Sequence, residues 1–245
     1  MNASSTPVAS EPRRVLLFGG GGCHLFAEIC PVLKGYLDAD PNLRVDYVQG
    51  DLDVFTAERI APYDLIVLYH TGGQLNAAQE RGLCEGIAAG KGFVGIHSAA
   101  DSFRESAPYR AMLGGNFRAH PCMRDYTVSL PHPNHPACAG IAGFTVKDWE
   151  KWPVFEYTVH DEQYLVDHDA RAEVIATAAF RGTVFPVAWV KGWGRGKVFY
   201  LALGHHVDGC RFPIFKDLFT GGVRWVAAPG AYTAPPTDAF SITWA

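Results

Sequence analysis

The chain has 245 residues, of which 48% are hydrophobic and 19% charged, and its formal net charge is −4. These values describe a globular protein with a substantial core, and they exclude the basic footprint of a nucleic-acid-binding protein. No apolar run approaches the roughly 20 residues that span a bilayer, so we expect no membrane partner and a cytoplasmic location. Residues 1–12 are rich in Ser, Ala and Pro without a signal-like apolar core, and we predict a disordered tail there.

The first half of the chain alternates short apolar runs with helical stretches. Strands are predicted at residues 13–18, 43–49 and 64–69, and helices over 25–38 and 77–89. Such alternation favours a parallel sheet with right-handed crossovers. The predicted fold class is therefore α/β, with a doubly wound, mostly parallel sheet and helices on both faces.

A glycine run followed by Cys23 and His24 comes directly after the first predicted strand. It matches neither G-x-G-x-x-G nor G-K-S/T, so it predicts neither a dinucleotide site nor a P-loop. We expect the glycines to let the backbone pass close to a ligand, with His24 at the rim of the crevice.

The most informative stretch is Lys-Gly-Phe-Val-Gly-Ile-His-Ser-Ala-Ala, residues 91–100. A short apolar run typical of a buried strand ends there in His97, at the carboxyl end of a strand, where open α/β sheets bind ligands. The small residues around His97 resemble a nucleophile elbow. An imidazole at the apex indicates an acid, a base or a metal ligand, and the alternative is a histidine that merely ends the strand.

After about residue 107 the pattern becomes β-rich, which predicts an elaboration added to the sheet. Residues 113–121 are interpreted as a loop, and strands are predicted at 126–130, 172–178, 184–190 and 198–203. A tight turn at 193–197 joins the last two strands, and a helix is predicted over 213–225. We predict one domain over residues 13–228 and a C-terminal arm over 229–245.

Histidines recur in turns and after strands. His205 and His206 follow the last predicted strand, whereas His132 and His135 lie in a proline-rich turn and are expected to be solvated rather than ligands. The six cysteines have no C-x-x-C spacing, and we expect buried thiols rather than a disulfide framework.

Six motifs then occur in order along the chain. They are Gly-Phe-Val-Gly-Ile-His-Ser-Ala (92–99), Gly-Gly-Asn-Phe-x-x-His-Pro (114–121), His-Pro-x-x-x-Gly-Ile (135–141), Asp-Glu-x-Tyr (161–164), Pro-Val-Ala-Trp-Val (186–190) and Gly-x-Gly-Lys-Val-Phe-Tyr-x-x-Leu-Gly-His (194–205). Together they resemble the trehalose-utilisation, or ThuA-like, family, from about Arg13 to Ala227. The first loop departs from the family pattern, since Gly19 to Cys23 replace a more polar segment.

The resemblance implies a class I glutamine-amidotransferase-like fold, which is a flavodoxin-like sheet. It also implies a role in the catabolism of oxidised sugars, namely 3-keto-glycosides made by a partner sugar 3-dehydrogenase. The family's functional candidates correspond to His24, His97, His120, Glu162 and His205.

A 3-keto group makes the C2 proton acidic, so a base can remove it and the C1 oxygen can leave by elimination. Addition of water would complete a net hydrolysis. This route requires a base, a group that stabilises the enolate and an acid. An ordinary glycosidase would need two carboxylates flanking the bond, whereas Asp161 and Glu162 are neighbours that point to opposite faces of an extended segment.

We assign His97 as base or enolate stabiliser, His120 and His205 as its partners, and Glu162 as the group that orients an imidazole or binds sugar hydroxyls. The candidate substrate-binding residues are His24, Ser98, Arg118, Asp161 and Tyr164.

Whether a divalent metal is a cofactor is left open, because an ion that polarises the keto oxygen can equally be held by His97, His120, Glu162 and His205. The expected partner is a small oxidised sugar or glycoside. Whether the chain forms a homo-oligomer is left open. Two alternatives remain, a keto-sugar isomerase or epimerase and a non-catalytic sugar-binding module. An amidotransferase is disfavoured because the elbow lacks a cysteine.

Overall fold

The structure, a computed structural model, describes residues 11–143 and 155–233. Most of the predicted N-terminal tail and most of the predicted C-terminal arm lie outside these residues. No helix in the described ranges is long and apolar enough to cross a bilayer.

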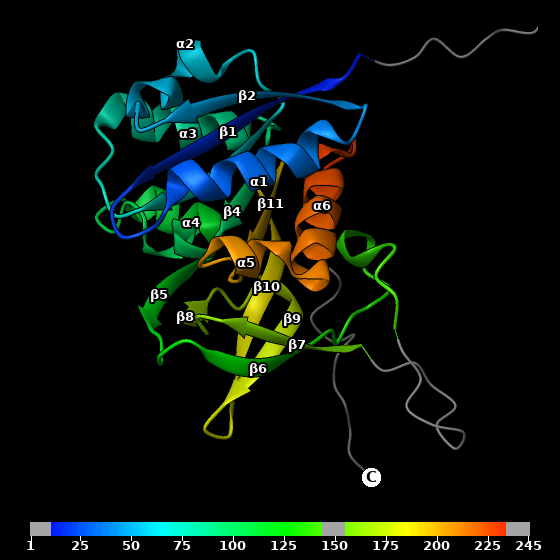
Figure 1. Cartoon of the computed structure of the whole chain (residues 1–245). Coiled ribbons are helices and arrows are strands. Elements are labelled where there is room, and N and C mark those ends of the chain that lie inside the picture. Colours follow the sequence, from blue (N-terminus) through cyan, green and yellow to red (C-terminus); the bar gives the residue numbers. More distant parts are fainter. Residues whose placement is uncertain (1–10, 144–154, 234–245) are drawn as a thin grey trace, which may run out of the picture.

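A mixed sheet forms the centre of the described part of the chain, with strands in the order β2-β1-β3-β4-β11-β10-β9-β6-β7 (Figure 1). The first five strands are parallel: β2 (Leu43–Gln49), β1 (Arg13–Gly21), β3 (Leu65–Thr71), β4 (Gly92–Ile96) and β11 (Gly196–Leu201). Their order is that of a flavodoxin-like sheet. The α/β prediction is confirmed.

The predicted β-rich elaboration continues this sheet with antiparallel strands. These are β10 (Thr183–Trp193), β9 (Glu173–Phe180), β6 (Arg124–Ser129) and β7 (Glu156–Asp161). The predicted turn joins β10 to β11.

The loop interpretation of residues 113–121 was wrong. Part of that stretch is strand β5 (Gly115–Ala119), which pairs with β8 (Leu165–His168) in a small separate sheet. A Cβ on Gly115 would lie 2.6 Å from the Trp189 ring, so glycine serves close packing here. The same glycine hides the alternation that identifies a strand.

Helices cover both faces of the parallel strands, as predicted (Figure 1). One face carries α1 (Phe26–Asp38), α5 (Val207–Arg211) and α6 (Pro213–Ala227). The other carries α2 (Ala57–Ile60), α3 (Ala77–Ala88) and α4 (Ala107–Leu113). The described residues also form three short 3-10 helices: η1 (Leu52–Phe55), η2 (His97–Asp101) and η3 (Pro136–Cys138).

The core explains why these segments fold as they do. Residues of β3 and β4 are buried along their whole length, as expected for strands covered on both faces. Asn76 caps α3, and its side chain accepts from the backbone of Gln79 while the Gln79 side chain accepts from the Asn76 backbone. All six cysteines are free; four are buried, as expected, and Cys23 and Cys122 are exposed.

Candidate functional site

The turn that follows β4 is as cramped as its small residues predicted. His97 has a left-handed φ of 45° and begins η2 directly after Ile96. A Cβ on Gly95 would lie 2.9 Å from Leu113 Cδ1, so a larger residue here would have to displace the Leu113 side chain. The Tyr200 hydroxyl donates to the His97 carbonyl oxygen at 2.7 Å and holds the apex in place. Backbone strain of this kind accompanies functional positions.

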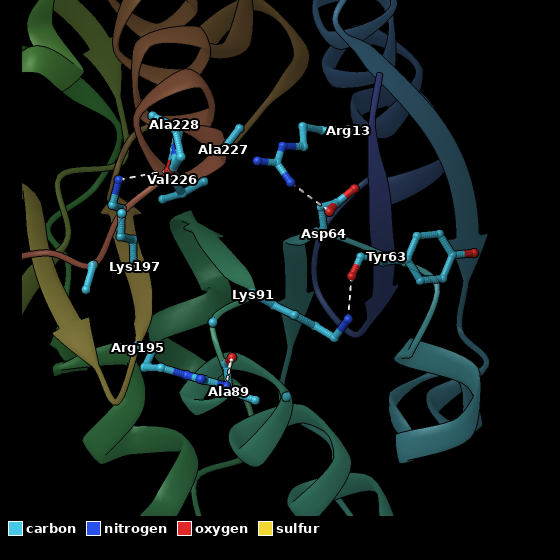
Figure 2. A pocket seen from close by; sticks show the side chains of 15 residues that line it. Arg13, Tyr63, Asp64, Ala89, Lys91, Arg195, Lys197, Val226, Ala227 and Ala228 are labelled. Atoms are coloured by element: carbon cyan, nitrogen blue, oxygen red, sulfur yellow. Dashed lines mark hydrogen bonds and ion pairs between the residues drawn. The ribbon is translucent and has the colours of Figure 1, made fainter. Parts of the chain in front are cut away.

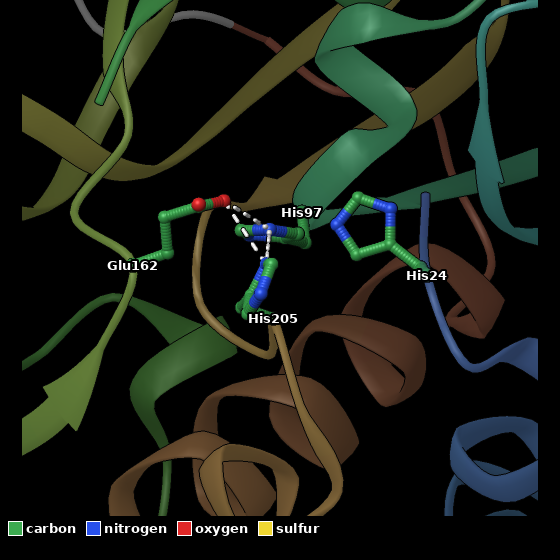
Figure 3. A group of neighbouring side chains, drawn as sticks. All are labelled: His24, His97, Glu162 and His205. Atoms are coloured by element: carbon green, nitrogen blue, oxygen red, sulfur yellow. Dashed lines mark hydrogen bonds and ion pairs between the residues drawn. The ribbon is translucent and has the colours of Figure 1, made fainter. Parts of the chain in front are cut away.

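Four side chains from separate segments converge on this turn: His24, His97, Glu162 and His205 (Figure 3). Each offers one nitrogen or oxygen atom, and these four atoms all lie within 4.8 Å of one another. His24, His97 and His205 follow the parallel strands β1, β4 and β11, and Glu162 follows β7. The convergence at the carboxyl ends of strands agrees with the expected location of a site.

Glu162 connects the cluster. Its Oε2 lies 3.0 Å from His205 Nδ1 and 3.4 Å from His97 Nε2, and those two nitrogens are 3.3 Å apart. Burial alone would raise the pKa of the Glu162 carboxyl, but hydrogen bonds with His205 and His97 outweigh burial and lower its pKa well below the usual range. Glu162 is therefore a carboxylate at neutral pH.

The outer nitrogens of two imidazoles are already engaged. His97 Nδ1 lies 2.7 Å from the Ala202 carbonyl oxygen, so this nitrogen donates and Nε2 carries the lone pair in the neutral ring. His24 Nδ1 lies 2.7 Å from Thr71 Oγ1. The other nitrogen of His24, Nε2, is buried and has no hydrogen-bond partner within the described residues. Burial, together with His97 and His205, lowers the pKa of His24 to about 3, so the ring is neutral.

His120 lies beside the cluster rather than in it. Its Nδ1 is 2.9 Å from Glu162 Oε1 and 3.0 Å from the Pro121 carbonyl oxygen, so the two oxygens of Glu162 serve different imidazoles. The His120 side chain is 42% exposed, compared with 0% for His97. His120 is thus the imidazole that a molecule from solvent reaches first.

Asp161 is buried beneath the site instead of facing it. Its carboxylate accepts hydrogen bonds from the backbone N–H of Gly204 at 2.7 Å, Glu162 at 2.9 Å and His205 at 3.1 Å. Asp161 therefore ties the loop that carries Glu162 to the loop that carries His205. The sequence suggested substrate binding for Asp161, and only the fold reveals this anchoring contact.

The other candidate substrate-binding residues occupy different environments. Tyr164 is buried, with its ring centroid 3.9 Å from that of His97, and forms a wall of the site. Arg118 is exposed and pairs with Asp167 through a 2.7 Å hydrogen bond from Nε. Ser98 is fully buried behind the elbow. His24 joins the central cluster, whereas His120, expected among the metal ligands, does not.

A cavity of about 540 Å³ lies at the opposite, amino ends of the parallel strands (Figure 2). Two of its cations donate to backbone oxygens, Lys197 Nζ to Ala228 at 3.0 Å and Arg195 to Ala89 at 2.8 Å, and Arg13 pairs with the carboxylate of Asp64 at 3.1 Å. Both backbone acceptors lie just after helices, where a cation stabilises the terminal carbonyl groups. We therefore interpret this cavity as structural.

The fold and the site define a flavodoxin-like α/β protein with a histidine–carboxylate cluster at the carboxyl edge of its sheet. The chain belongs to the ThuA family, described as trehalose utilisation, whose family model matches residues 14–226. The family ties the protein to a sugar-related role. No curated protein matches the sequence closely enough to count as a relative.

Solved structures agree on the fold. A ThuA-like protein from Parabacteroides merdae is 19% identical with a TM-score of 0.74, covering 93% of this chain and 94% of that one. A ThuA-like protein from Bacteroides uniformis is 18% identical with a TM-score of 0.71, covering 91% and 95%. A β-galactosidase from Rahnella sp. R3 is 15% identical with a TM-score of 0.56, and the match covers 90% of this chain but 32% of that enzyme.

Proposed function

We propose that the protein cleaves 3-keto-glycosides by removing the C2 proton, eliminating the C1 oxygen and adding water, with net hydrolysis. The observation that carries the proposal is the carboxylate of Glu162, which bridges the buried His97, the partly exposed His205 and the exposed His120. This arrangement separates a proton-transfer group from a group that can stabilise charge, and the route needs both. The family's link to trehalose utilisation supports a sugar substrate.

His120 is the base in this proposal. The carboxylate of Glu162 orients the ring from the Nδ1 side, which leaves Nε2 for the substrate. The same pairing stabilises the imidazolium that forms when the C2 proton is taken. His97 has no exposed surface, so it is less suited than His120 to reaching C2. The partly exposed His205 is the imidazole of the cluster that can lie beside the enolate oxygen at C3.

His120 takes the C2 proton, and the electrons of the C2–H bond form the enolate. These electrons then form the C1=C2 bond while the C1–O bond breaks, and His120 returns its proton to the departing oxygen. Water adds at C1 and a proton is restored to C2, which gives the free 3-keto sugar and the aglycone. The substrate must come from an oxidation at C3, which a sugar dehydrogenase can supply.

The test follows methyl 3-keto-glucoside with the purified protein in D2O by NMR. We expect methanol release together with deuterium at C2 of the sugar. His120→Gln is expected to lower the release rate by about 10²–10⁴-fold, the range of general acid–base catalysis. The matched control is His160→Gln, because His160 is a surface histidine on β7 that pairs with Asp125 outside the site.

Three results would overturn the proposal. Deuteration without release would indicate an isomerase or epimerase. Neither signal across several 3-keto-glycosides would indicate a binding module. Equal rates for His120→Gln and His160→Gln would remove His120 from the chemistry.

A further inference from the structure

The spacing of the central cluster is that of ligands around one ion. Zinc bonds of about 2.0–2.1 Å in a regular tetrahedron place neighbouring ligand atoms about 3.3 Å apart. The three separations among His97 Nε2, His205 Nδ1 and Glu162 Oε2 are 3.0, 3.3 and 3.4 Å. Three edges of the cluster therefore already have the length that a small divalent cation requires.

The direction of the lone pairs points the same way. His97 donates its Nδ1 hydrogen to a backbone carbonyl, which is the contact that orients metal-binding histidines. His24 is held from its Nδ1 side by Thr71, and its buried Nε2 has no partner in the described part of the chain. Figure 3 shows the His24 ring turned toward His97, opposite Glu162. An unpaired buried acceptor costs free energy unless something occupies the space it faces.

Without a cation, the cluster cannot satisfy all its atoms. The carboxylate of Glu162 and Nε2 of His97 are acceptors. With the Nδ1 hydrogen of His24 donated to Thr71 Oγ1, Nε2 of His24 is an acceptor as well, and His205 Nδ1 is then the ring nitrogen of these four residues that can donate a hydrogen. That single hydrogen reaches Glu162 or His97, and His24 is left unpaired. A cation at the centre would accept all four lone pairs at once.

We propose that His24, His97, His205 and Glu162 bind one divalent transition-metal ion of the zinc class. Three imidazoles and one carboxylate suit Zn²⁺ and its first-row neighbours, whereas Mg²⁺ and Ca²⁺ prefer oxygen ligands. The His205 side chain is 30% exposed, so the cluster is accessible from its side and from that of His120. There the ion would polarise the C3 keto oxygen of the substrate. That chemical role rests on the proposed function, whereas the binding of the ion does not.

The proposal assigns different tasks to two histidines. His24 is a ligand, and His120 stays outside the ligand set because it contacts the other oxygen of Glu162. Binding and turnover should therefore respond differently to substitutions at the two positions.

The experiment measures metal directly. The full-length chain is stripped with a chelator, and zinc and manganese are titrated by calorimetry, with metal content checked by mass spectrometry. We expect about one equivalent of ion in the wild type, in His160→Ala and in His120→Gln. His24→Ala and Glu162→Gln are expected to weaken binding by about 100-fold or more, since even an outer contact of a metal ligand is worth about 10–100-fold.

The outcomes separate the ion from the reaction. Failure of the wild type to bind any of these ions would overturn the metal site, and so would His24→Ala that binds like His160→Ala. If His24→Ala does not give a native circular dichroism spectrum, Glu162→Gln decides alone, because it preserves size and shape. Ion binding without turnover of keto-glycosides would leave the site standing and overturn the function. Full turnover of keto-glycosides by the metal-free protein would leave the proposed function standing and overturn the role of the ion in the reaction.

Discussion

The buried carboxylate of Asp161 offers a sharp test of how the site is held together. It accepts three backbone hydrogen bonds, from Glu162 and from two consecutive residues of the loop after β11, Gly204 and His205. Burial by itself would raise the pKa of Asp161, but the contact with His206, the proximity of His97 and the backbone N–H groups of Gly204 and Glu162 lower it. Asp161→Asn keeps the shape of the side chain and removes its charge.

The size of the effect follows from the contacts. In its better orientation the amide oxygen keeps the bonds from Glu162 and His205, each weakened by about 1 kcal/mol on going from a charged to a neutral acceptor. The amide NH2 then faces the N–H of Gly204, which leaves a buried donor unpaired at a cost of about 1–3 kcal/mol. Relief from burying a charge offsets part of this loss. We expect a net loss of about 2–4 kcal/mol in the free energy of unfolding.

Urea denaturation at pH 7, followed by circular dichroism and tryptophan fluorescence, measures this loss. The control is Asp125→Asn, because Asp125 lies on the neighbouring strand β6 with its side chain 75% exposed and pairs with His160 at the surface. An exposed pair is worth about 0–1 kcal/mol. If Asp161→Asn unfolded within 0.5 kcal/mol of Asp125→Asn, a margin set by typical surface substitutions, the anchoring role would be refuted.

Two further substitutions test the framework around the site. Burial lowers the pKa of His70 to about 4, so the free energy of unfolding falls as the pH drops from about 7 to 5, because the imidazole takes up a proton in the unfolded chain but not in the native state. His70→Asn retains a donor to Ser102 and should reduce this fall by about 1–2 kcal/mol. Urea unfolding at the two pH values measures it, and an unchanged pH dependence would contradict the prediction. Gly95→Ala places a Cβ 2.9 Å from Leu113 Cδ1 and should lower the free energy of unfolding by about 1–3 kcal/mol. Gly35→Ala lies on helix α1, where a Cβ meets nothing within 4 Å, and should raise it by about 0.5–1 kcal/mol. Thermal melts compare the two variants, and a higher melting temperature for Gly95→Ala than for Gly35→Ala would contradict the packing argument.

The strands that carry the site were predictable because their sequences carry a strong local signal. The runs that became β3 and β4 are continuous apolar stretches, and each ends abruptly in glycine or histidine. Parallel strands in one sheet must place such ends along one edge. The position of His97, and its proximity to the residues after β1 and β11, therefore followed from sequence and topology.

Contacts between residues far apart in the sequence could not be predicted from local sequence patterns. Nothing local distinguishes Asp161 from Glu162, since adjacent residues on an extended segment differ only in the face to which they point. Their tasks diverge because the loop after β11 brings the Gly204 and His205 N–H groups under the chain at Asp161. The predicted single domain over residues 13–228 stays a prediction.

His24 and His120 have different proposed roles, metal ligand and proton-transfer group, and only the geometry of the site distinguishes them. Both histidines belong to motifs or loops that suggest a site, and by residue type they are interchangeable as ligands. Thr71 contacts His24 Nδ1, and the buried Nε2 has no partner among residues 11–143 and 155–233, whereas His120 is solvent-accessible and contacts the outer oxygen of Glu162. A buried acceptor with no donor is suited to a cation, and an exposed imidazole on a carboxylate is suited to moving protons. The same carboxylate serves both, so Glu162→Gln should weaken ion binding and slow proton transfer together, whereas substitutions at His24 and His120 should separate the two effects.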